Sequence, residues 1–396
     1  MPLPQIPPRL WPRFTSPLHS PAVVARVGRV LGVFFAICFV TGLLSHYRYH
    51  PWHFLPIPAA PVWGYRLTQG LHVITGIATL PLLLIKLWTV YPRLFEWPPA
   101  RSLVKILERL SIAVLVSTAS VEIVIGLLNI LQWYPWKWSF VFVHYTLAYV
   151  SIGALILHIA VKLPTIQQGL ATPLGRVPNP SDPTASDPTA SGPTASAQAV
   201  HGGLSRRGLI TAAAAGVTVV ATVTVGQVIT PLESVALLAP RRPKGGQLGV
   251  PINRTAVEAA TTKSSIDPSW RLTVIGLHPF DLTIDDVEAL AQLERTLPIA
   301  CVEGWSIDAH WRGVSLLDLV HRVGGNSGSR VQFDSLEREG PFRQSSLQGP
   351  QVGHALLATH LNGARLTVDH GYPLRLIAPD HPGVFNTKWL DTITVV

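Results

Sequence analysis

The sequence predicts a multi-domain protein: an N-terminal all-α transmembrane four-helix bundle, a fifth transmembrane helix and a C-terminal domain of mixed α+β structure. Three observations support this prediction. Apolar residues make up 48% of the 396 residues and charged residues only 13%, which is unusual for a purely soluble protein. Five apolar stretches approach or exceed the roughly 20 helical residues that cross a bilayer. Beyond them, short β-rich runs alternate with turns.

The first four apolar stretches form the predicted bundle, which we place within residues 20–165. They cover residues 24–45, 67–90, 104–131 and 139–163. The fifth stretch, residues 208–229, is rich in Ala, Val and Thr and only moderately hydrophobic. We assign it to an anchor over residues 205–230.

The rest of the chain divides into a linker and a folded domain. Residues 166–204 contain the repeat SDPTASDPTASGPTASAQ, whose small polar residues and prolines cannot build a core and therefore predict disorder. Residues 240–396 change character and predict the α+β domain. Within it we expect strands near residues 270–275, 375–377 and 392–396, and a helix over residues 315–323.

Charge is distributed unevenly along the chain. Residues 1–164 hold 13 Lys and Arg against 3 Asp and Glu, whereas residues 230–396 hold 15 against 17. The folded domain is thus slightly acidic, which argues against nucleic acid as a partner. Basic residues gather at one set of helix ends, so the positive-inside rule predicts a cytoplasmic N-terminus and an extracytoplasmic C-terminal domain. We expect a multi-pass protein of the plasma membrane with lipid as a partner.

Three histidines lie inside predicted spans, where an ionisable side chain is a functional candidate because it is costly to bury in lipid. His144 and His158 are 14 residues apart and so return to nearly the same helix face. His72 enters the second span about as deep as His144 enters the fourth. The two imidazoles could therefore face each other as an axial pair for haem iron. The alternative is that these histidines only hydrogen-bond across helices.

Residues 20–165 resemble the b-type cytochrome subunits of membrane dehydrogenases and hydrogenases, in which the fourth span carries two histidines at this spacing. The resemblance implies one haem b held by His72 and His144, with His158 as the candidate ligand of a second haem. In that family the inner haem takes another ligand from the start of the first span. Here that segment reads RVGRVLG without histidine, and Lys86 lies 14 residues beyond His72.

The chain has two cysteines, Cys38 in an apolar span and Cys301 in the C-terminal domain, so no disulfide framework is expected. Cys301 stands in the segment LPIACVEGWSIDAHWRGVSLLDLV, residues 297–320. This segment resembles the metal-binding segment of the sulfite oxidase and methionine sulfoxide reductase molybdopterin fold. The resemblance implies that Cys301 is the thiolate ligand of molybdenum. A lone cysteine is otherwise a small buried hydrophobe.

Residues 360–396, HLNGARLTVDHGYPLRLIAPDHPGVFNTKWLDTITVV, resemble the C-terminal pterin segment of the same fold. Carried over by position, Arg375 and Lys388 would hold the pterin phosphate, with Asn386 and Thr387 beside them. Arg375 could equally be a surface charge at a strand edge.

Other positions depart from that pattern or match it less closely. His370 stands where the family has Asn, Ser335 falls where the family has Thr, and Asn253 is a candidate upstream cofactor contact. Four further residues follow Cys301 closely enough to line its pocket: Glu303, Trp305, His310 and Arg312.

Arg206 and Arg207, just before the fifth stretch, look like a twin-arginine export signal placed inside the chain. That route moves folded proteins, which suits a cofactor inserted in the cytosol. The alternative is that the two arginines only obey the positive-inside rule. No clear A-x-A cleavage site follows, so we expect the segment to remain as an anchor.

These resemblances imply a membrane oxidoreductase that contains Mo-molybdopterin and haem b. It would pass electrons between quinone or quinol, or another carrier, and a small extracytoplasmic substrate such as a sulfoxide. The words EGWS after the cysteine, with Trp311 and Gly313, are closer to the methionine sulfoxide reductase branch. Sulfite oxidase-like activity and a non-catalytic haem conduit or sensor stay open as alternatives.

Overall fold

A computed structural model describes most of the chain. The described residues are 17–52, 54–94, 102–174, 205–237, 239, 241, 242 and 244–396. The repeat within the predicted linker lies outside them. So do four of the basic residues near the predicted cytoplasmic helix ends, Arg9, Arg13, Arg101 and Arg176.

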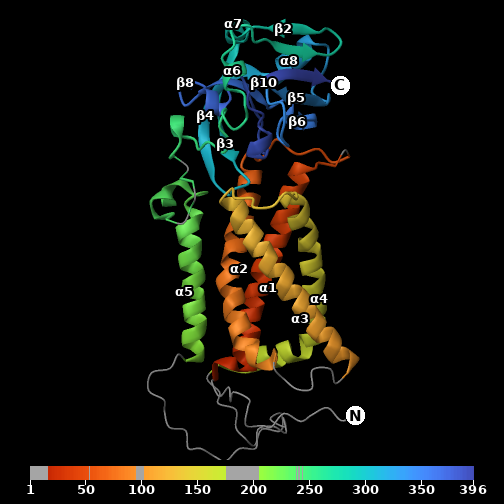
Figure 1. Ribbon diagram of the computed structural model, residues 1–396, viewed down its shortest axis with the longest axis vertical. Helices are drawn as coiled ribbons and strands as arrows, with labels where there is room; N and C mark the ends of the chain where they lie inside the picture. Colours follow the sequence, from red (N-terminus) through yellow and green to blue (C-terminus); the bar gives the residue numbers. More distant parts are fainter. Residues whose placement is uncertain are drawn as a thin grey trace, which may run out of the picture. The chain divides into compact units, whose positions relative to one another are not determined.

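The described residues contain five helices that are long and apolar enough to cross a membrane by length and composition (Figure 1). Each falls on one of the five apolar stretches: the first two helices extend the predicted stretch at both ends, the third nearly coincides with it, the fourth continues to residue 171 and the fifth ends at residue 225. Their bounds are α1 Pro21–Tyr49, α2 Gly64–Leu94, α3 Leu103–Ile130, α4 Phe140–Ala171 and α5 Arg206–Val225. Hydropathy finds such helices because a helix satisfies its backbone groups within its own segment.

By its contacts the chain divides into two compact units. The first holds one end of the long helices, where Arg26 on α1 caps α4 by donating to the carbonyl oxygens of Gly169, Leu170 and Thr172 at 3.0–3.2 Å. The second unit combines Ile37–Ile77, Val124–Tyr145 and Ala221–Val396. It therefore contains the other ends of the helices together with the C-terminal domain.

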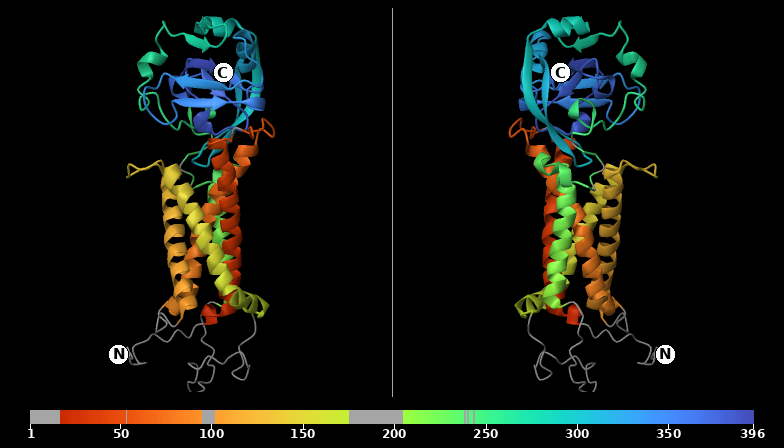
Figure 2. Two further views of the ribbon diagram at one scale, coloured as in Figure 1. Left: turned by 90° about the vertical axis from the view of Figure 1, so that its right-hand side faces the viewer. Right: turned by 90° about the vertical axis from the view of Figure 1, so that its left-hand side faces the viewer.

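The C-terminal domain contains two five-stranded sheets, seen from two sides in Figure 2. The first has the order β2-β1-β10-β5-β6; the second runs β3-β4-β7-β8, with β9 paired to β7. The strands of the first sheet are β1 Leu272–Ile275, β2 Phe280–Leu282, β5 Val331–Ser335, β6 Gln344–Leu347 and β10 Leu390–Val395. Those of the second are β3 Gln292–Ala300, β4 Ser306–Ser315, β7 Leu356–Leu361, β8 Ala364–Arg365 and β9 Arg375–Ile377. The short helices are α6 Thr262–Ser265, α7 Ile284–Ala289 and α8 Leu316–Arg322.

The predicted α+β pattern is confirmed in this domain. The three expected strands correspond to β1, β9 and β10, and the expected helix corresponds to α8. β1 and β10 pair in parallel although they lie at opposite ends of the domain sequence, with Thr273 opposite Thr392. The main core includes Phe333 and Leu357, both fully buried.

Two strand ends position the candidate site. β3 and β4 form an antiparallel hairpin that closes at the pair Ala300–Ser306, so residues 301–305, here called the cysteine loop, form its tip. β9 begins at Arg375 and pairs with β7, which in turn pairs with β4. The two motif segments that lie far apart in sequence thus both contribute strands to the second sheet.

Replacing Phe333 by Ala should destabilise the domain by about 3–5 kcal/mol, because it removes a fully buried ring and leaves a cavity. Leu277, which is 76% exposed, is the matched control, and Leu277→Ala should change stability by no more than about 0.5 kcal/mol. Chemical unfolding of the full chain, followed by hydrogen exchange in β5 and β10, would measure both. Equal effects of the two substitutions would contradict the core assignment.

Candidate functional site

The cysteine loop holds Cys301 in a buried, fixed position. Cys301 is 2% exposed, and its N–H donates to the carbonyl oxygen of Trp305 at 2.9 Å. Gly304 donates back to the carbonyl oxygen of Cys301 at 3.0 Å. Its φ of 95° lies in the region that residues with a side chain rarely adopt, so the turn requires glycine here. The loop is therefore a tight turn with the thiol at its start.

A buried carboxyl group lies beside the thiol. Glu303 is 2% exposed, pairs with Arg241 at 2.6 Å and accepts a hydrogen bond from Trp305 Nε1 at 3.0 Å. Burial raises the pKa of Glu303, although Arg241 opposes the shift. Burial, and then the charge of Glu303, raise the pKa of Cys301 above its usual value. The thiol is therefore neutral unless a metal cation displaces its proton.

Both motif segments reach one small pocket. Its lining consists of Pro251, Asn253, Ile299, Cys301, Trp305, Arg375 and Gly383. Gly383 lies so close to the end of β3 that a Cβ there would be 2.7 Å from the carbonyl oxygen of Ala300. Three of the residues singled out as cofactor contacts, Asn253, Cys301 and Arg375, thus meet in space.

Arg375 is a buried cation in this pocket. It is 3% exposed, its Nη1 donates to the carbonyl oxygen of His370 at 3.2 Å, and its Nε makes no hydrogen bond. Burial lowers the pKa of Arg375 to about 10. No carboxylate of the described residues forms an ion pair with it. The alternative of a surface charge at a strand edge is therefore wrong, and the pocket suits an anionic group that would compensate the buried charge.

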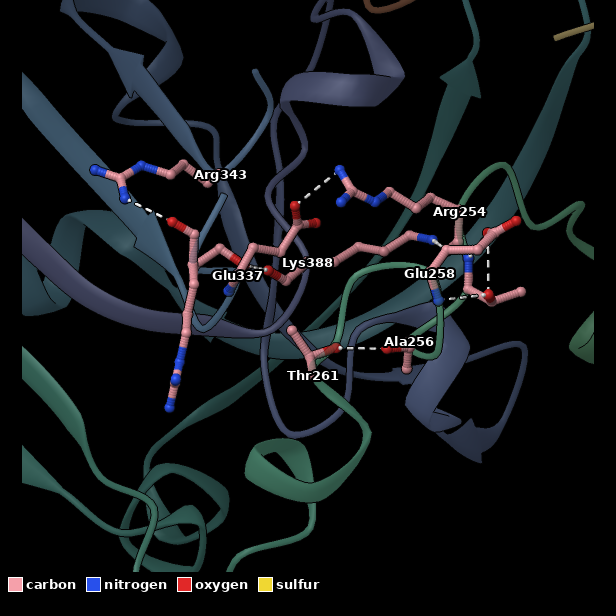
Figure 3. Close-up of polar contacts among 10 residues, drawn as sticks. Arg254, Ala256, Glu258, Thr261, Glu337, Arg343 and Lys388 are labelled. Carbon is pink, nitrogen blue, oxygen red and sulfur yellow. Dashed lines mark hydrogen bonds and ion pairs between the residues drawn. The ribbon is translucent and has the colours of Figure 1, made fainter. Parts of the chain in front are cut away.

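Lys388 is a second cation close to the first. Its Nζ donates to the carbonyl oxygens of Arg254 and Asp369 at 2.8 and 2.9 Å, and Figure 3 shows its side chain extending toward Arg254. Burial lowers the pKa of Lys388 well below its usual value, and the charge of Arg375 adds to this shift. Gly371 has a φ of 107°, and a Cβ there would lie 3.1 Å from Lys388 Cα. The glycine of the HGYPLR motif thus makes room for this lysine.

The other predicted contacts brace this region from outside the pocket lining. Thr387 bonds through its hydroxyl to Ser345 at 2.6 Å, and Asn386 Oδ1 accepts from the amide of Ala378 at 2.9 Å. Ser335 Oγ donates to the carbonyl oxygen of Lys388 at 2.8 Å. These bonds fix the backbone of the pterin segment.

His370 is 1% exposed and takes part in the same bracing. Its Nδ1 lies 2.8 Å from Thr367 Oγ1, and its Nε2 lies 3.1 Å from the carbonyl oxygen of Val250. Since that oxygen can only accept, Nε2 carries the proton. Both ring nitrogens are thus engaged with protein, and only the backbone carbonyl of His370 reaches Arg375.

The structure places His310 and Arg312 away from the pocket. Both alternate with buried Trp311 along β4 and so point to the exposed face of the strand. Glu303 and Trp305 are instead buried beside Cys301. Sequence reasoning missed Arg241, the partner of Glu303, because no local pattern links residues so far apart along the chain.

His72 and His144 lie together, as predicted. Their ring centroids are 5.9 Å apart with an interplanar angle of 85°. A metal–imidazole bond is about 2 Å long and a ring nitrogen lies about 1 Å from the ring centre, so two axial imidazoles would have centroids about 6 Å apart. His72 Nδ1 lies 2.8 Å from the carbonyl oxygen of Cys38, a contact that fixes the orientation of the ring. The spacing of the two rings would allow both imidazoles to hold one metal ion between them.

Glycines lie beside this pair. A Cβ at Gly42 would be 2.9 Å from His72 Cε1, and one at Gly126 would be 3.9 Å from His144 Cε1. Neither cysteine forms a disulfide, but Cys38 Sγ lies 3.5 Å from His72 Nδ1. The sequence offered no signal for this contact.

His158 has different neighbours. In the part of the chain that the structure describes, no second histidine ring packs against it, and the charged groups that act on it are Lys86, Lys162 and Glu108. Glu108 pairs with Lys162 at 2.6 Å. A second haem at His158 stays a prediction without a second protein ligand. The described residues also contain no group of three or more metal-ligating side chains. A site with a single cysteine ligand does not require such a group.

Comparison with known proteins identifies the C-terminal region. Residues 259–396 match the model of the oxidoreductase molybdopterin binding domain. Sulfite oxidase of Arabidopsis thaliana is 31% identical, with 32% of this chain and 42% of that protein covered. The uncharacterized oxidoreductase YuiH of Bacillus subtilis (strain 168) is 36% identical, covering 31% of this chain and 62% of that one.

A third relative is the protein-methionine-sulfoxide reductase catalytic subunit MsrP of Ralstonia nicotianae, 32% identical over 32% of this chain and 44% of its own. Each match thus spans less than two thirds of the relative. The sulfane dehydrogenase SoxCD of Paracoccus pantotrophus aligns with 22% identity, 33% and 40% coverage and a TM-score of 0.30. By sequence, residues 259–396 thus resemble the molybdopterin-binding domain of oxidoreductases, those of sulfite oxidase and MsrP among them.

Acid should weaken the fold of this domain through His370. Burial lowers its pKa from 6.5 to about 4, and the charges of Arg375 and Lys388 act in the same direction. Between these values the unfolded chain binds more protons than the folded one, so stability should fall by up to about 3 kcal/mol as pH drops from about 6.5 to 4.

The measurement is chemical unfolding of the domain between pH 7 and 5, with His370→Asn as the variant. The variant should show a shallower dependence on pH but not a flat one, because burial also lowers the pKa of His381 to about 4. A variant that follows the wild-type curve would contradict the role given to His370.

Proposed function

We propose that this chain is a membrane-bound molybdenum oxidoreductase that passes electrons between a quinone pool, or another carrier, and an extracytoplasmic oxygen-atom-transfer substrate. A sulfoxide is the favoured substrate. The observation that carries the proposal is the pocket that joins Cys301 to the buried, uncompensated Arg375. Such a pair suits a thiolate-bound metal beside an anionic cofactor.

Residues of the pocket and its surroundings would hold the cofactor and supply a proton for the reaction. Cys301 would ligate molybdenum, while Arg375 and Lys388 would compensate the pterin phosphate. When bound, the molybdenum cofactor supplies two-electron oxygen-atom transfer. Glu303 is buried beside Cys301, and its raised pKa suits it to hold a proton near the reacting oxygen. Trp305 is buried in the lining of the same pocket and would limit the access of water.

Two substrate classes remain, and each has support. Reducing a sulfoxide consumes two electrons and two protons and releases one water, so a proton donor such as Glu303 is needed. Oxidising sulfite consumes water and releases two electrons and two protons, and the positive pocket suits that anion. The EGWS segment favours the sulfoxide, and the similarity to plant sulfite oxidase supports the alternative.

The helical part would connect this site to the membrane. His72 and His144 would ligate one haem b, which accepts and donates single electrons. We place the N-terminus in the cytoplasm and the molybdenum domain outside it, with α5 as an anchor. Arg206 and Arg207 would act as the twin-arginine export signal for the folded domain.

Cys301→Ala should abolish molybdenum-dependent turnover and leave the haem spectrum intact, since the thiolate is the only protein ligand proposed for the metal. His72→Ala should do the reverse: lose haem while keeping molybdenum and turnover with a dye that serves the molybdenum domain directly. Elemental analysis, absorption spectra and assays with methionine sulfoxide and sulfite would measure each effect. Unchanged turnover of the Cys301 variant would refute the site. A wild-type protein that contains no molybdenum would instead favour a non-catalytic haem conduit or sensor.

Arg375→Met should lower pterin content at least about tenfold, since a charge-assisted contact to phosphate is lost. In cofactor-free protein the same variant should be as stable as wild type or more stable, because a buried cation without a counter-ion is replaced by an apolar side chain. Pterin fluorescence and thermal unfolding of the two forms measure the two effects. The matched control is Arg271→Met at an exposed position, which should retain the cofactor.

A further inference from the structure

We infer that Gln69 is a positioning residue that couples the cysteine loop to the helix carrying His72 and thereby sets the rate of electron transfer between the two redox sites. This inference rests on the proposed function. All of its contacts lie within the second compact unit, which contains both the cysteine loop and this part of α2.

The first contact is a buried hydrogen bond. Gln69 is 8% exposed, and its Nε2 donates to the carbonyl oxygen of Val302 at 3.0 Å. Val302 directly follows Cys301, and Gln69 precedes His72 by three residues of the same helix, so the two α2 side chains lie on neighbouring positions of one face. One hydrogen bond thus joins the residue next to the thiolate to the turn that precedes the imidazole.

The second contact is close packing at Gly304. A Cβ there would lie 3.0 Å from both γ-carbons of Val73 and 3.0 Å from Gln227 Nε2. Val73 follows His72 directly, and the carbonyl oxygen of Gln227 accepts from the amide of Ser306 at 2.8 Å. The cysteine loop therefore touches α2 on both sides of His72 in sequence.

Other contacts hold the surrounding surfaces together independently of Gln69. Arg66 donates to both carboxylate oxygens of Asp308 at 2.8 and 2.9 Å. Arg48 pairs with the buried Asp380 at 2.9 Å, and the amide of Tyr65 also donates to that carboxylate. Loss of the single bond from Gln69 should therefore leave the domain docked on the helix ends. A change seen in the Gln69 variant can therefore be assigned to the cysteine loop and not to separation of the domain from the helix ends.

The contact between the cysteine loop and α2 matters because two electrons must pass between the redox sites, one at a time, in each turnover. Each sulfoxide reduced to a sulfide and water takes two electrons and two protons, all of which one quinol can supply as it becomes quinone. A haem passes electrons singly, so the path is used twice per turnover. The rate of electron transfer falls faster with distance across an empty gap than along covalent and hydrogen bonds. The hydrogen bond from Gln69 to Val302 replaces such a gap with a bonded route.

The test compares Gln69→Leu with Gln292→Leu in the full-length holoprotein. Leucine keeps the bulk of glutamine and removes its donor. Gln292 is the matched control because its amide also bonds only to backbone carbonyls, those of Val287, Glu288 and Leu290, away from the cysteine loop. Three quantities are measured: substrate-driven haem oxidation in a rapid-mixing experiment, quinol-linked turnover and turnover with a soluble dye donor.

Gln69→Leu should slow haem oxidation by about tenfold or more, and should lower quinol-linked turnover far more than dye-linked turnover. In cofactor-free protein, it should also speed hydrogen exchange of residues 301–306, whereas Gln292→Leu should change none of these readouts. The inference would be overturned if haem oxidation in Gln69→Leu were as fast as in the wild type. It would also be overturned if quinol-linked and dye-linked turnover fell equally. If the wild-type protein contains no haem, the inference fails together with the haem assignment, while dye-linked turnover still reports on the molybdenum site.

Discussion

The guanidinium of Arg375 imposes the main constraint on the C-terminal domain. A cation that is 3% exposed and lacks a carboxylate partner among the described residues destabilises a fold unless an anion joins it. The domain places Cys301 on the same pocket and Lys388 close by, so the proposed metal ligand and the proposed phosphate contacts lie near one another. The hairpin of β3 and β4, the glycines and the bracing hydroxyls all serve to hold these few atoms in place.

Most of the architecture could be predicted from the sequence. The long helices could be predicted from hydropathy, since long apolar stretches are typical of helices that pair all their backbone groups within their own segment. The strands near residues 270–275, 375–377 and 392–396 follow from local pattern and turn residues. The pairing of His72 with His144 followed from depth within two spans, and the common pocket of Cys301 and Arg375 followed from motif order.

The rest depends on contacts between polar residues far apart in the sequence. Glu303 with Arg241, Asp380 with Arg48, and Gln69 with Val302 carry no local periodicity, so no pattern announces them. The error at His310 had a different cause: proximity in sequence to Cys301 was taken as proximity in space. In a strand, successive side chains point to opposite faces, so closeness along the chain does not place a residue in the pocket.

The cap that Arg26 places on α4 constrains when the bundle can be completed. The guanidinium belongs to α1, whereas the carbonyl oxygens of α4 that accept its hydrogen bonds lie 143 to 146 residues later in the sequence. Until that turn has been synthesised, the guanidinium can still donate to the carbonyl oxygen of Ala22 on its own helix, while its remaining N–H groups need other acceptors such as water. A nascent chain that stops before residue 169 would therefore lack the carbonyl groups at the end of α4, and α1 and α4 could not yet be joined by these hydrogen bonds.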